Sequence, residues 1–559
     1  MSARKSNHFL VQGSILAAAS LIVRMIGLVY RIPMTNIIGD EGMGYYGNAF
    51  EIYNIALILS SYSLPIAVSK LVATRSSNKE YKNSYRTFLC AMSFAIVVGL
   101  IATLALFFGA DFISTVINKS PNGALPIKVL APTIFVFSIM GVFRGFYQGK
   151  NTMLPTAISQ VIEQIFNAVI SVVAASLLIK NYSASVNSAA YGAAGGTFGT
   201  LIGAFAGLLF LLFVFVLYKP ILNKQLKNDK TSIRASYGDI IKLLLITISP
   251  IILSQTVYHI SGVIDNSLFG NIMSTKEVTS FDKIVLKNVI PGQLYTEENY
   301  MALLGMYGNK YRLLSNVPVA IATAIGAAIV TSISVDKLRG FDNAIRRKTN
   351  SAIKFNMIIA IPSAVGMGVL AYPILQLLFK NTNNIAAANF LRLGSMSIVF
   401  YSLSTVSTAI LQGINKLKIP VINSAISLGV HIVLVYCLLK FTPLSTYALV
   451  IGNVSFALVV CILNWISIEK YLNYRQEILK TFVIPAVSAG LMGVAAFLTY
   501  KGLYLWTGNN TLATLLSMLN AVIVYLALLI FMKGVEEEEL EFLPKGKSII
   551  RVLRRLHLL

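Results

Sequence analysis

The chain has 559 residues, of which 56% are hydrophobic and only 12% are charged, and its formal net charge is +24. This composition excludes a soluble globular protein and indicates a polytopic membrane protein. In a membrane protein the excess of lysine and arginine gives information on which loops face the cytoplasm, and it does not indicate nucleic-acid binding. The three cysteines lie in apolar runs without CxxC spacing, which argues against a disulfide or metal site.

Fourteen apolar runs are long enough to span a membrane, because a helix rising about 1.5 Å per residue needs roughly 20 residues to cross about 30 Å of hydrocarbon. The sequence therefore predicts an all-α polytopic membrane protein with about 14 transmembrane helices. The predicted spans are 9–32, 48–72, 86–109, 125–147, 155–179, 190–218, 243–270, 311–334, 352–379, 386–411, 419–440, 443–467, 480–501 and 511–532.

The loop charges favour this topology. If both termini lie on one side, the loops of that side hold 32 lysines and arginines and the opposite loops hold 11. The rule that cytoplasmic loops are rich in positive charge then places both termini in the cytoplasm. This count assigns Arg144 and Lys150 to one cytoplasmic loop and leaves Arg24, Arg31 and Arg312 within the spans.

Two halves of the chain repeat each other. Gln148-Gly149 followed by Pro155 recurs about 264 residues later as Gln412-Gly413 followed by Pro420. The repeat predicts two six-helix lobes, a plan common among transporters with a site between the halves. The predicted parts are an N-terminal lobe at 1–235, a second lobe at 236–468 with an external insert at 274–309, two additional helices at 469–532, and a cytoplasmic amphipathic tail at 533–559.

The first span carries the most informative polar pattern. Ser20, Arg24, Gly27 and Arg31 fall at i, i+4, i+7 and i+11 and therefore share one helix face. Arginine at mid-bilayer costs about 2.5–3.5 kcal/mol, so two arginines on one face predict a wet cavity. Since a guanidinium stays charged and offers a planar fork of donors, the expected ligand is an anion.

Further polar residues within the spans are candidates for the same cavity. The seventh span carries Ser254, Tyr258, Ser261 and Asp265 at the spacing found in the first span, and the fifth carries Glu163 and Asn167. Simpler interpretations stay open. Asp265 could have a purely structural role as the ion-pair partner of an arginine. His431 could be a neutral hydrogen-bonding residue instead of a proton relay, and Arg312 could extend toward the lipid headgroups.

Several motifs resemble one known family. RMIGLVYRIP at 24–33, IIGDEGMGYYG after it, LSSYSLPIAVSKLVA at 59–73 and FYQGKNTMLPTAISQVIEQ at 146–164 are similar to the polysaccharide-transporter branch of the multidrug/oligosaccharidyl-lipid/polysaccharide superfamily. Within that branch the chain resembles the SpoVB/YtgP-type proteins, relatives of the MurJ lipid II flippases and members of the MATE-like superfamily.

The resemblance implies fourteen helices in two lobes and an alternating-access cavity. It also implies export of an undecaprenyl-pyrophosphate-linked sugar, such as lipid II, across the bacterial cytoplasmic membrane. Arginines on the first, second and eighth helices line the cavity of MurJ proteins. Arg24 and Arg312 fit two of these positions, Arg31 stands one residue beyond the MurJ spacing, and the second helix, from Glu51 through Leu64, has no arginine.

The expected function is a flippase and not an enzyme, with Arg24, Arg31, Arg312 and Tyr258 binding substrate. Glu163, Asn167, Asp265, Ser254, Ser261 and His431 are expected to line the cavity or couple ions. No cofactor is expected, and transport is driven by Na⁺, H⁺ or the membrane potential. The expected partners are the lipid-linked saccharide, the bilayer and cell-wall synthesis enzymes, with no nucleic acid. An ion-coupled drug extruder, a membrane-embedded transferase and a non-transporting scaffold are the alternatives.

Overall fold

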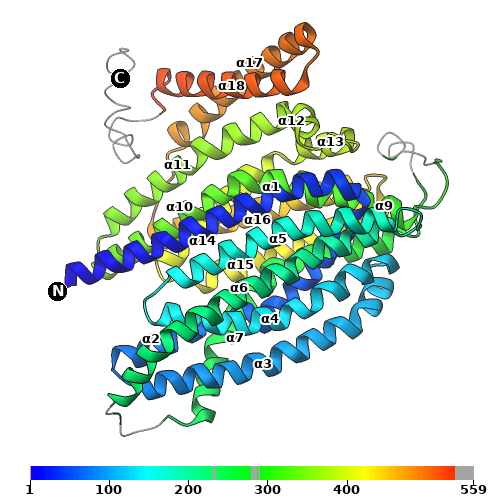
Figure 1. Cartoon of the computed structure of the whole chain (residues 1–559). Coiled ribbons are helices and arrows are strands. Elements are labelled where there is room, and N and C mark those ends of the chain that lie inside the picture. Colours follow the sequence, from blue (N-terminus) through cyan, green and yellow to red (C-terminus); the bar gives the residue numbers. More distant parts are fainter. Residues whose placement is uncertain (1, 230, 232–234, 279–285, 287–289, 535–559) are drawn as a thin grey trace. The chain divides into compact units, whose positions relative to one another are not determined.

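Helices dominate the computed structural model of the chain (Figure 1). The structure describes residues 2–229, 231, 235–278, 286 and 290–534, and within them no β-strand forms. The helices are α1 (Ser2–Leu57), α2 (Leu64–Ser77), α3 (Tyr81–Phe112), α4 (Ala124–Gly149), α5 (Leu154–Asn181), α6 (Ser188–Lys227), α7 (Tyr237–Met273), α9 (Glu297–Met306), α10 (Leu313–Leu338), α11 (Asp342–Val369), α12 (Ala371–Leu378), α13 (Ile385–Gly394), α14 (Met396–Gly413), α15 (Lys418–Phe441), α16 (Thr446–Leu472), α17 (Ile484–Thr507) and α18 (Asn510–Phe531).

The long helix α1 reverses direction at Gly39. This glycine has φ +72° and ψ −180°, a conformation that residues with a Cβ rarely adopt. Tyr30 and Tyr46 lie on opposite sides of it, and in a straight helix their Cα atoms would be about 24 Å apart. Their hydroxyls are instead hydrogen-bonded at 2.7 Å. The helix therefore consists of two arms that pack against each other.

This reversal bears on the number of membrane spans. Within the described residues, thirteen helical stretches are long and apolar enough to cross a membrane, which confirms the predicted all-α membrane fold. The first of them, Ala18–Ser77, covers residues 18–32 of the predicted span 9–32 and all of the predicted span 48–72. The predicted count of fourteen is thus not confirmed as a number, and the difference arises at the bend of α1, where the helices on either side of Gly39 follow each other without a loop.

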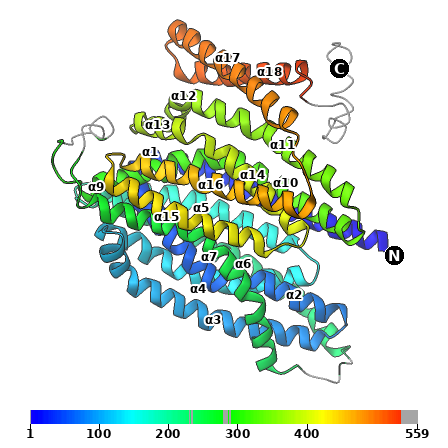
Figure 2. The ribbon, with the colours of Figure 1, turned by 180° about the vertical axis from the view of Figure 1, so that it is seen from behind.

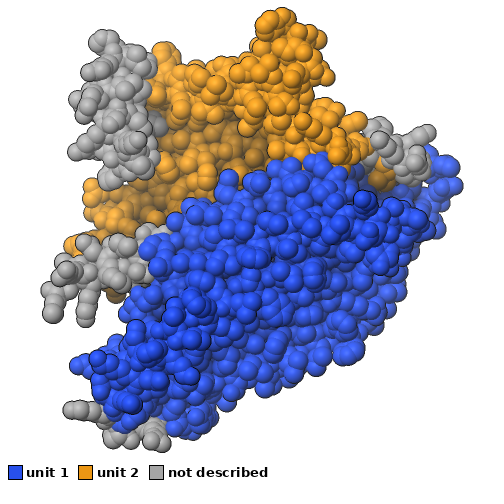
Figure 3. Space-filling model, viewed as in Figure 1, with its two compact units in different colours: residues 1–278, 289–309 blue, residues 279–288, 310–559 orange. Residues whose placement is uncertain are grey.

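The chain divides into two compact units, which Figure 3 colours separately. Unit 1 comprises residues 1–278 and 289–309, and unit 2 comprises residues 279–288 and 310–559. In unit 1, an aromatic cluster joins α3, α4 and α6: the ring of Phe88 lies 5.5 Å from Phe143, 4.8 Å from Phe146 and 5.4 Å from Phe215. Among the described residues of the unit, these rings belong to one buried apolar cluster, and a second surrounds Tyr53 and Ile127.

Small residues let α5 and α6 lie side by side along their length (Figures 1 and 2). A Cβ added to Gly199 of α6 would lie 2.2 Å from the Oγ atom of Ser171, and one added to Gly203 would lie 2.4 Å from the carbonyl oxygen of Glu163. Both distances are too short for a real side chain. The contact therefore requires glycine, and it fixes the position of the helix that carries Glu163.

The short helix α9 of the predicted insert is packed on the bend of α1 in unit 1. A Cβ on Gly305 would overlap the carbonyl oxygen of Asp40, and one on Gly44 would lie 2.0 Å from the carbonyl oxygen of Met301. The carboxylate of Glu297 accepts hydrogen bonds from the Ser120 hydroxyl and from the backbone N–H and side-chain amide of Asn122. Helix α9 of the insert is thus built into unit 1.

Unit 2 packs around a second apolar core formed by α10, α11, α14, α16, α17 and α18. On α17 and α18 many large apolar side chains are exposed, as expected for helices that face lipid. The predicted boundaries of the lobes at 235 and 468 stay predictions, since the compact units reflect packing and the lobes were inferred from the repeat. Within the predicted amphipathic tail, residues 535–559 lie outside the described residues.

Candidate functional site

The guanidinium of Arg31 lies against tyrosines of α1. Its Cζ atom is 5.9 Å from the centroid of the Tyr46 ring, and Tyr46 is held in turn by Tyr30. Gly196 of α6 closes over Tyr46, where a Cβ would be 3.1 Å from the ring. The Nε atom of Arg31 is buried without a hydrogen-bond partner. No ion pair joins Arg31 to an acidic residue within the described part of the chain.

The other residues predicted on the Arg31 face differ in their surroundings. Arg24 is exposed, and the hydroxyl of half-buried Ser20 donates to the carbonyl oxygen of Leu16. Gly27 faces α5, where an added Cβ would lie 3.3 Å from Gln164 Nε2. The face predicted from sequence thus lies on one arm of α1, where Arg31 is half-buried against tyrosines and Arg24 is exposed.

Glu163 forms an ion pair with an arginine that the sequence analysis assigned to a loop. Arg144 lies in α4, is 9% exposed, and places its Nη2 atom 2.7 Å from Glu163 Oε2. Its Nε atom donates to the Ser159 hydroxyl at 3.0 Å. The assignment of Arg144 to a cytoplasmic loop was therefore wrong. α4 continues to Gly149, so an arginine near the end of an apolar run can still be within the helix bundle.

Asn167, one helical turn beyond Glu163, joins α5 to α6. Its Oδ1 atom accepts hydrogen bonds from the hydroxyls of Ser171 at 2.9 Å and Thr200 at 3.2 Å. On the same helix the buried Oε1 atom of Gln160 has no hydrogen-bond partner. The polar residues of α5 therefore have three different roles. Glu163 forms an ion pair, Asn167 joins α5 to α6, and Gln160 has an unsatisfied amide oxygen.

The last turns of α7 are linked to α1 through asparagines. Asp265 is buried, and the amide of its neighbour Asn266 donates to Asn48 Oδ1 at 3.2 Å. The Asn118 amide donates to the same oxygen at 3.0 Å, while Ser267 donates to Asn118 Oδ1. Ser261 is half-buried beside Gly262, where an added Cβ would touch the carboxylate of Glu51. The side chains of Ser254 and Tyr258 lie outside the described residues.

Two predicted site residues belong to unit 2. Arg312 is half-buried before α10, next to Tyr311, whose hydroxyl lies 3.1 Å from Ser397 Oγ and 3.3 Å from Asn453 Oδ1. His431 of α15 is buried and donates from Nδ1 to the carbonyl oxygen of Gly452 in α16 at 2.9 Å. Phe456 packs edge-on against its ring. The ring is therefore held between α15 and α16.

Sequence reasoning missed Arg144 and the tyrosines around Arg31. Arg144 lies inside the predicted span 125–147, 19 residues before Glu163, and this position could have indicated that it lies within the helix bundle. The signal for Tyr46 was weaker, because nothing in the sequence shows that α1 folds back at Gly39.

Comparison with known proteins identifies the family. The family model described as polysaccharide biosynthesis protein matches residues 10–334, which is more than half of the chain. This chain belongs to the polysaccharide biosynthesis protein family. A second model, described as lipid II flippase MurJ, matches residues 305–529 of this family member.

Similar proteins cover nearly the same length. The chain is 27% identical over 494 residues to the lipid II flippase MurJ of Bacillus subtilis (strain 168), covering 86% of each chain. It is 24% identical over 546 residues to stage V sporulation protein B of the same strain, covering 97% of this chain and 99% of that protein. A solved structure of lipid II flippase MurJ in an inward closed conformation matches with a TM-score of 0.65 at 16% identity, covering 92% and 97%.

These matches confirm the predicted resemblance, and the structural match confirms the fold. This member of the polysaccharide biosynthesis protein family is a multi-pass membrane protein.

Proposed function

We propose that this chain is a flippase that moves a polyprenyl-pyrophosphate-linked saccharide outward across the bacterial cytoplasmic membrane. Undecaprenyl pyrophosphate is the expected carrier, as in lipid II, and both termini are in the cytoplasm. Three findings support the proposal: membership of the polysaccharide biosynthesis protein family, similarity to a lipid II flippase over most of both chains, and the match in fold. Cell-wall synthesis enzymes are its proposed partners.

The observation that carries the proposal is the environment of Arg31. Its guanidinium is packed on the Tyr46 ring, and its Nε donor is buried without a partner. A buried donor without an acceptor costs about 1–3 kcal/mol, and more when the group is charged, so the site is stabilised by an incoming acceptor. A pyrophosphate supplies several oxygens with negative charge in the geometry that a guanidinium binds through two donors.

Arg24 is the proposed second contact to the headgroup. It lies seven residues before Arg31, or about 10.5 Å along the same arm of α1, and it is exposed. Arg312 and Tyr258 are proposed as further substrate contacts. Glu163, Asn167, Asp265, Ser254, Ser261 and His431 are proposed to line the cavity. Glu163 is the weakest candidate for ion coupling among the carboxylates, because Arg144 already neutralises it.

The membrane potential is the proposed driving force. Moving each negative charge outward through an inside-negative membrane releases about 2.3 kcal/mol per 100 mV. A substrate with two negative charges therefore gains about 4.6 kcal/mol per 100 mV on export, without a coupled ion.

The test is transport of a labelled polyprenyl-pyrophosphate saccharide by the full chain in liposomes. Arg31→Ala should abolish most transport, and Arg31→Lys should restore only part of it, because an ammonium keeps the charge but loses the planar fork. Arg392→Ala is the control, since the Arg392 side chain is exposed and its guanidinium donates to Asn389 of its own helix. Wild-type transport by Arg31→Ala would refute the role of Arg31.

Rescue of cells depleted of their lipid II flippase tests the substrate. Growth with the wild-type chain and none with Arg31→Ala would support lipid II as the cargo. Failure of the wild-type chain to rescue, with flipping of another polyprenyl-linked saccharide in liposomes, would identify a different saccharide. Resistance to cationic dyes on expression, without flipping of any polyprenyl substrate, would favour the drug extruder.

A further inference from the structure

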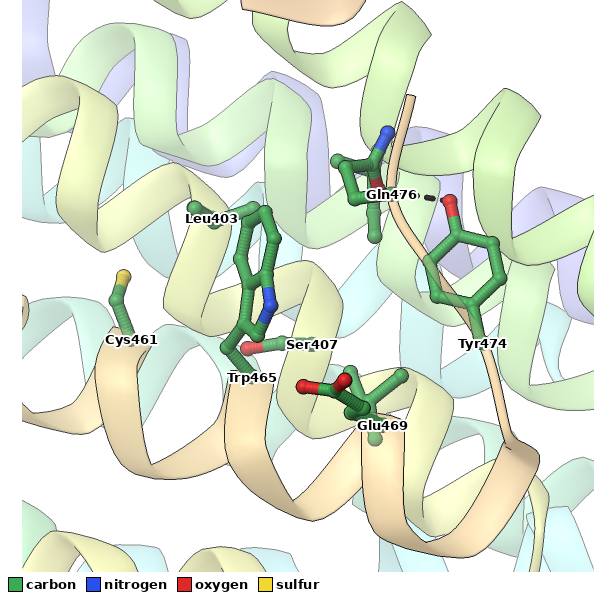
Figure 4. A pocket seen from close by; sticks show the side chains of 9 residues that line it. Leu403, Ser407, Cys461, Trp465, Glu469, Tyr474 and Gln476 are labelled. Atoms are coloured by element: carbon green, nitrogen blue, oxygen red, sulfur yellow. Dashed lines mark hydrogen bonds between the residues drawn. The ribbon is translucent and has the colours of Figure 1, made fainter. Parts of the chain in front are cut away.

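A pocket within unit 2 has no part in the transport proposal (Figure 4). It is a narrow, partly open space formed by one turn of α11, two turns of α14, the last turns of α16 and the segment that follows α16. Its lining residues are Ile353, Leu403, Ser407, Cys461, Trp465, Ile468, Glu469, Tyr474 and Gln476.

The sequence of α16 places an indole and a carboxylate on the same side of the pocket. Trp465 and Glu469 are four residues apart and therefore lie one above the other on the helix surface. Figure 4 shows the Glu469 carboxylate directed toward the space between the Trp465 ring and the Tyr474 ring. Trp465 is steadied by Phe482, whose ring centroid is 6.0 Å away.

The opposite wall is held rigidly by hydrogen bonds. The hydroxyl of Tyr474 lies 2.9 Å from Asn350 Oδ1 and 2.8 Å from Gln476 Oε1. The Gln476 amide donates to Asn350 Oδ1 at 3.1 Å and to Thr481 Oγ1 at 2.9 Å. These bonds fix the segment after α16 against α11, so the Tyr474 ring is preorganised and does not need to be ordered by a ligand.

The charge of Glu469 lacks a fixed counter-charge. The carboxylate is exposed at the pocket rim and forms no ion pair with any residue in the described ranges, although the nearby Glu477 pairs with Lys480 at 3.9 Å. The floor below it is apolar, formed by Ile353, Leu403 and Ile468. Two aromatic rings and one carboxylate around an apolar floor form the combination that binds an alkylated ammonium ion, through cation–π attraction and charge.

We propose that this pocket binds a small organic ammonium group. The pocket is narrow and partly open to its surroundings, so it suits a single headgroup-sized cation and not a drug-sized one. By the predicted topology the end of α16 is at the cytoplasmic face. The ligand is therefore either the amine headgroup of an inner-leaflet lipid or a free alkylammonium ion, and the chemistry of recognition is shared by both.

The test uses the fluorescence of Trp465. The chain has two tryptophans, and the other one, Trp506, is 84% exposed on α17, so Trp506→Phe leaves a single reporter in the full-length protein. Tetramethylammonium chloride is titrated in detergent at constant ionic strength, with 3,3-dimethyl-1-butanol as the uncharged molecule of the same shape. We expect a saturable fluorescence change with the cation and about tenfold weaker binding, or none, with the alcohol.

Two carboxylate variants form the matched pair. Glu469→Gln should weaken tetramethylammonium binding about tenfold, whereas Glu477→Gln, which removes an exposed carboxylate eight residues further along, should leave it unchanged. Equal melting temperatures of the two variants show that both are folded. An equal response to cation and alcohol, full affinity in Glu469→Gln, or no response to either a cation or an amine lipid overturns the proposal.

Nanodiscs separate the two sources of the ligand. If phosphatidylethanolamine weakens tetramethylammonium binding relative to phosphatidylglycerol alone, and Glu469→Gln removes that difference, the natural ligand is the lipid headgroup. If binding is the same in both membranes, the ligand is a free amine. A difference between the lipids that persists in Glu469→Gln contradicts the site. Transport is not measured, so the outcome is independent of the proposed flippase activity.

Discussion

Arg144 and Arg31 are two arginines within the helices of unit 1, and their surroundings differ. Arg144 is 9% exposed and bonds to Glu163 and Ser159, so its charge is compensated inside the protein. Arg31 lies against Tyr46, and its Nε donor is unsatisfied. Burial alone therefore does not identify a functional arginine. The acid beside Arg144 indicates a structural role, and the aromatic surroundings of Arg31 leave its charge available to a ligand.

The largest effect on stability is expected from breaking the Arg144–Glu163 pair. Glu163→Leu leaves a buried guanidinium unpaired, which should cost about 3–5 kcal/mol of unfolding free energy. The double variant Arg144→Leu/Glu163→Leu should recover most of that loss, because it removes both charges. Denaturant unfolding of the purified protein in detergent measures both values.

An exposed ion pair gives the control for that experiment. Asp111 pairs with Lys128 at 2.7 Å, but its side chain is 65% exposed. Asp111→Asn should therefore change stability by no more than about 1 kcal/mol. A double variant at 144 and 163 that is as unstable as Glu163→Leu would mean that the loss comes from packing and not from the unpaired charge.

The contrast also shows how far the sequence could lead. The spans were predictable because hydropathy is a local property, and the helical periodicity correctly separated Arg31 from loop arginines. The partners of the charges were not predictable. Arg144 meets Glu163 only because the chain turns between α4 and α5, and Arg31 meets Tyr46 only because Gly39 adopts a positive φ. Both are tertiary contacts, which hydropathy and helical spacing do not encode.

The second prediction concerns Gly203 of α6, which packs against the backbone of Glu163, the acidic residue of the ion pair. Gly203→Ala would place a Cβ 2.4 Å from the carbonyl oxygen of Glu163 and 3.0 Å from Asn167 Cβ, so α5 must shift away from α6. Overpacking of this kind typically costs about 1–3 kcal/mol. Thermal unfolding should show a lower melting temperature. Gly429→Ala in α15, where a Cβ meets no atom within 4 Å, should be neutral or slightly stabilising.

The third prediction concerns Arg31, where a substitution should affect stability little and transport strongly, in contrast to Glu163→Leu. Arg31→Leu removes a charge with no acidic partner in the described residues. It loses the contacts with the Tyr30 and Tyr46 side chains but also removes the cost of the unsatisfied Nε donor, so the free energy of unfolding should change by no more than about 1 kcal/mol. Flipping in liposomes should nevertheless be lost. A fall in stability as large as that of Glu163→Leu would show that Arg31 is a structural residue like Arg144, and the distinction between the two arginines would disappear.

The smallest effect is expected at a third cation, Lys150 in the turn after α4. Its Nζ atom lies 5.2 Å from the Tyr81 ring centroid and 5.6 Å from that of Phe146, and burial lowers the pKa of Lys150 from its ordinary 10.5 to about 8. Unlike arginine, lysine can release its proton in such a place. Between pH 8 and 10.5 the unfolded chain binds more protons at this residue than the folded chain, so its contribution to stability rises with pH across that window.

Lys150→Met should remove this pH dependence. Because the side chain is partly exposed, solvent screening reduces the effect to a few tenths of a kcal/mol. The measurement is the difference in unfolding free energy between wild type and Lys150→Met at pH 7.5 and pH 10. The variant should be the more stable protein at pH 7.5, and the difference should shrink at pH 10. A difference that grows with pH would mean that the ammonium is stabilised by its aromatic neighbours, as a guanidinium is, and that cation–π contact outweighs desolvation in this unit.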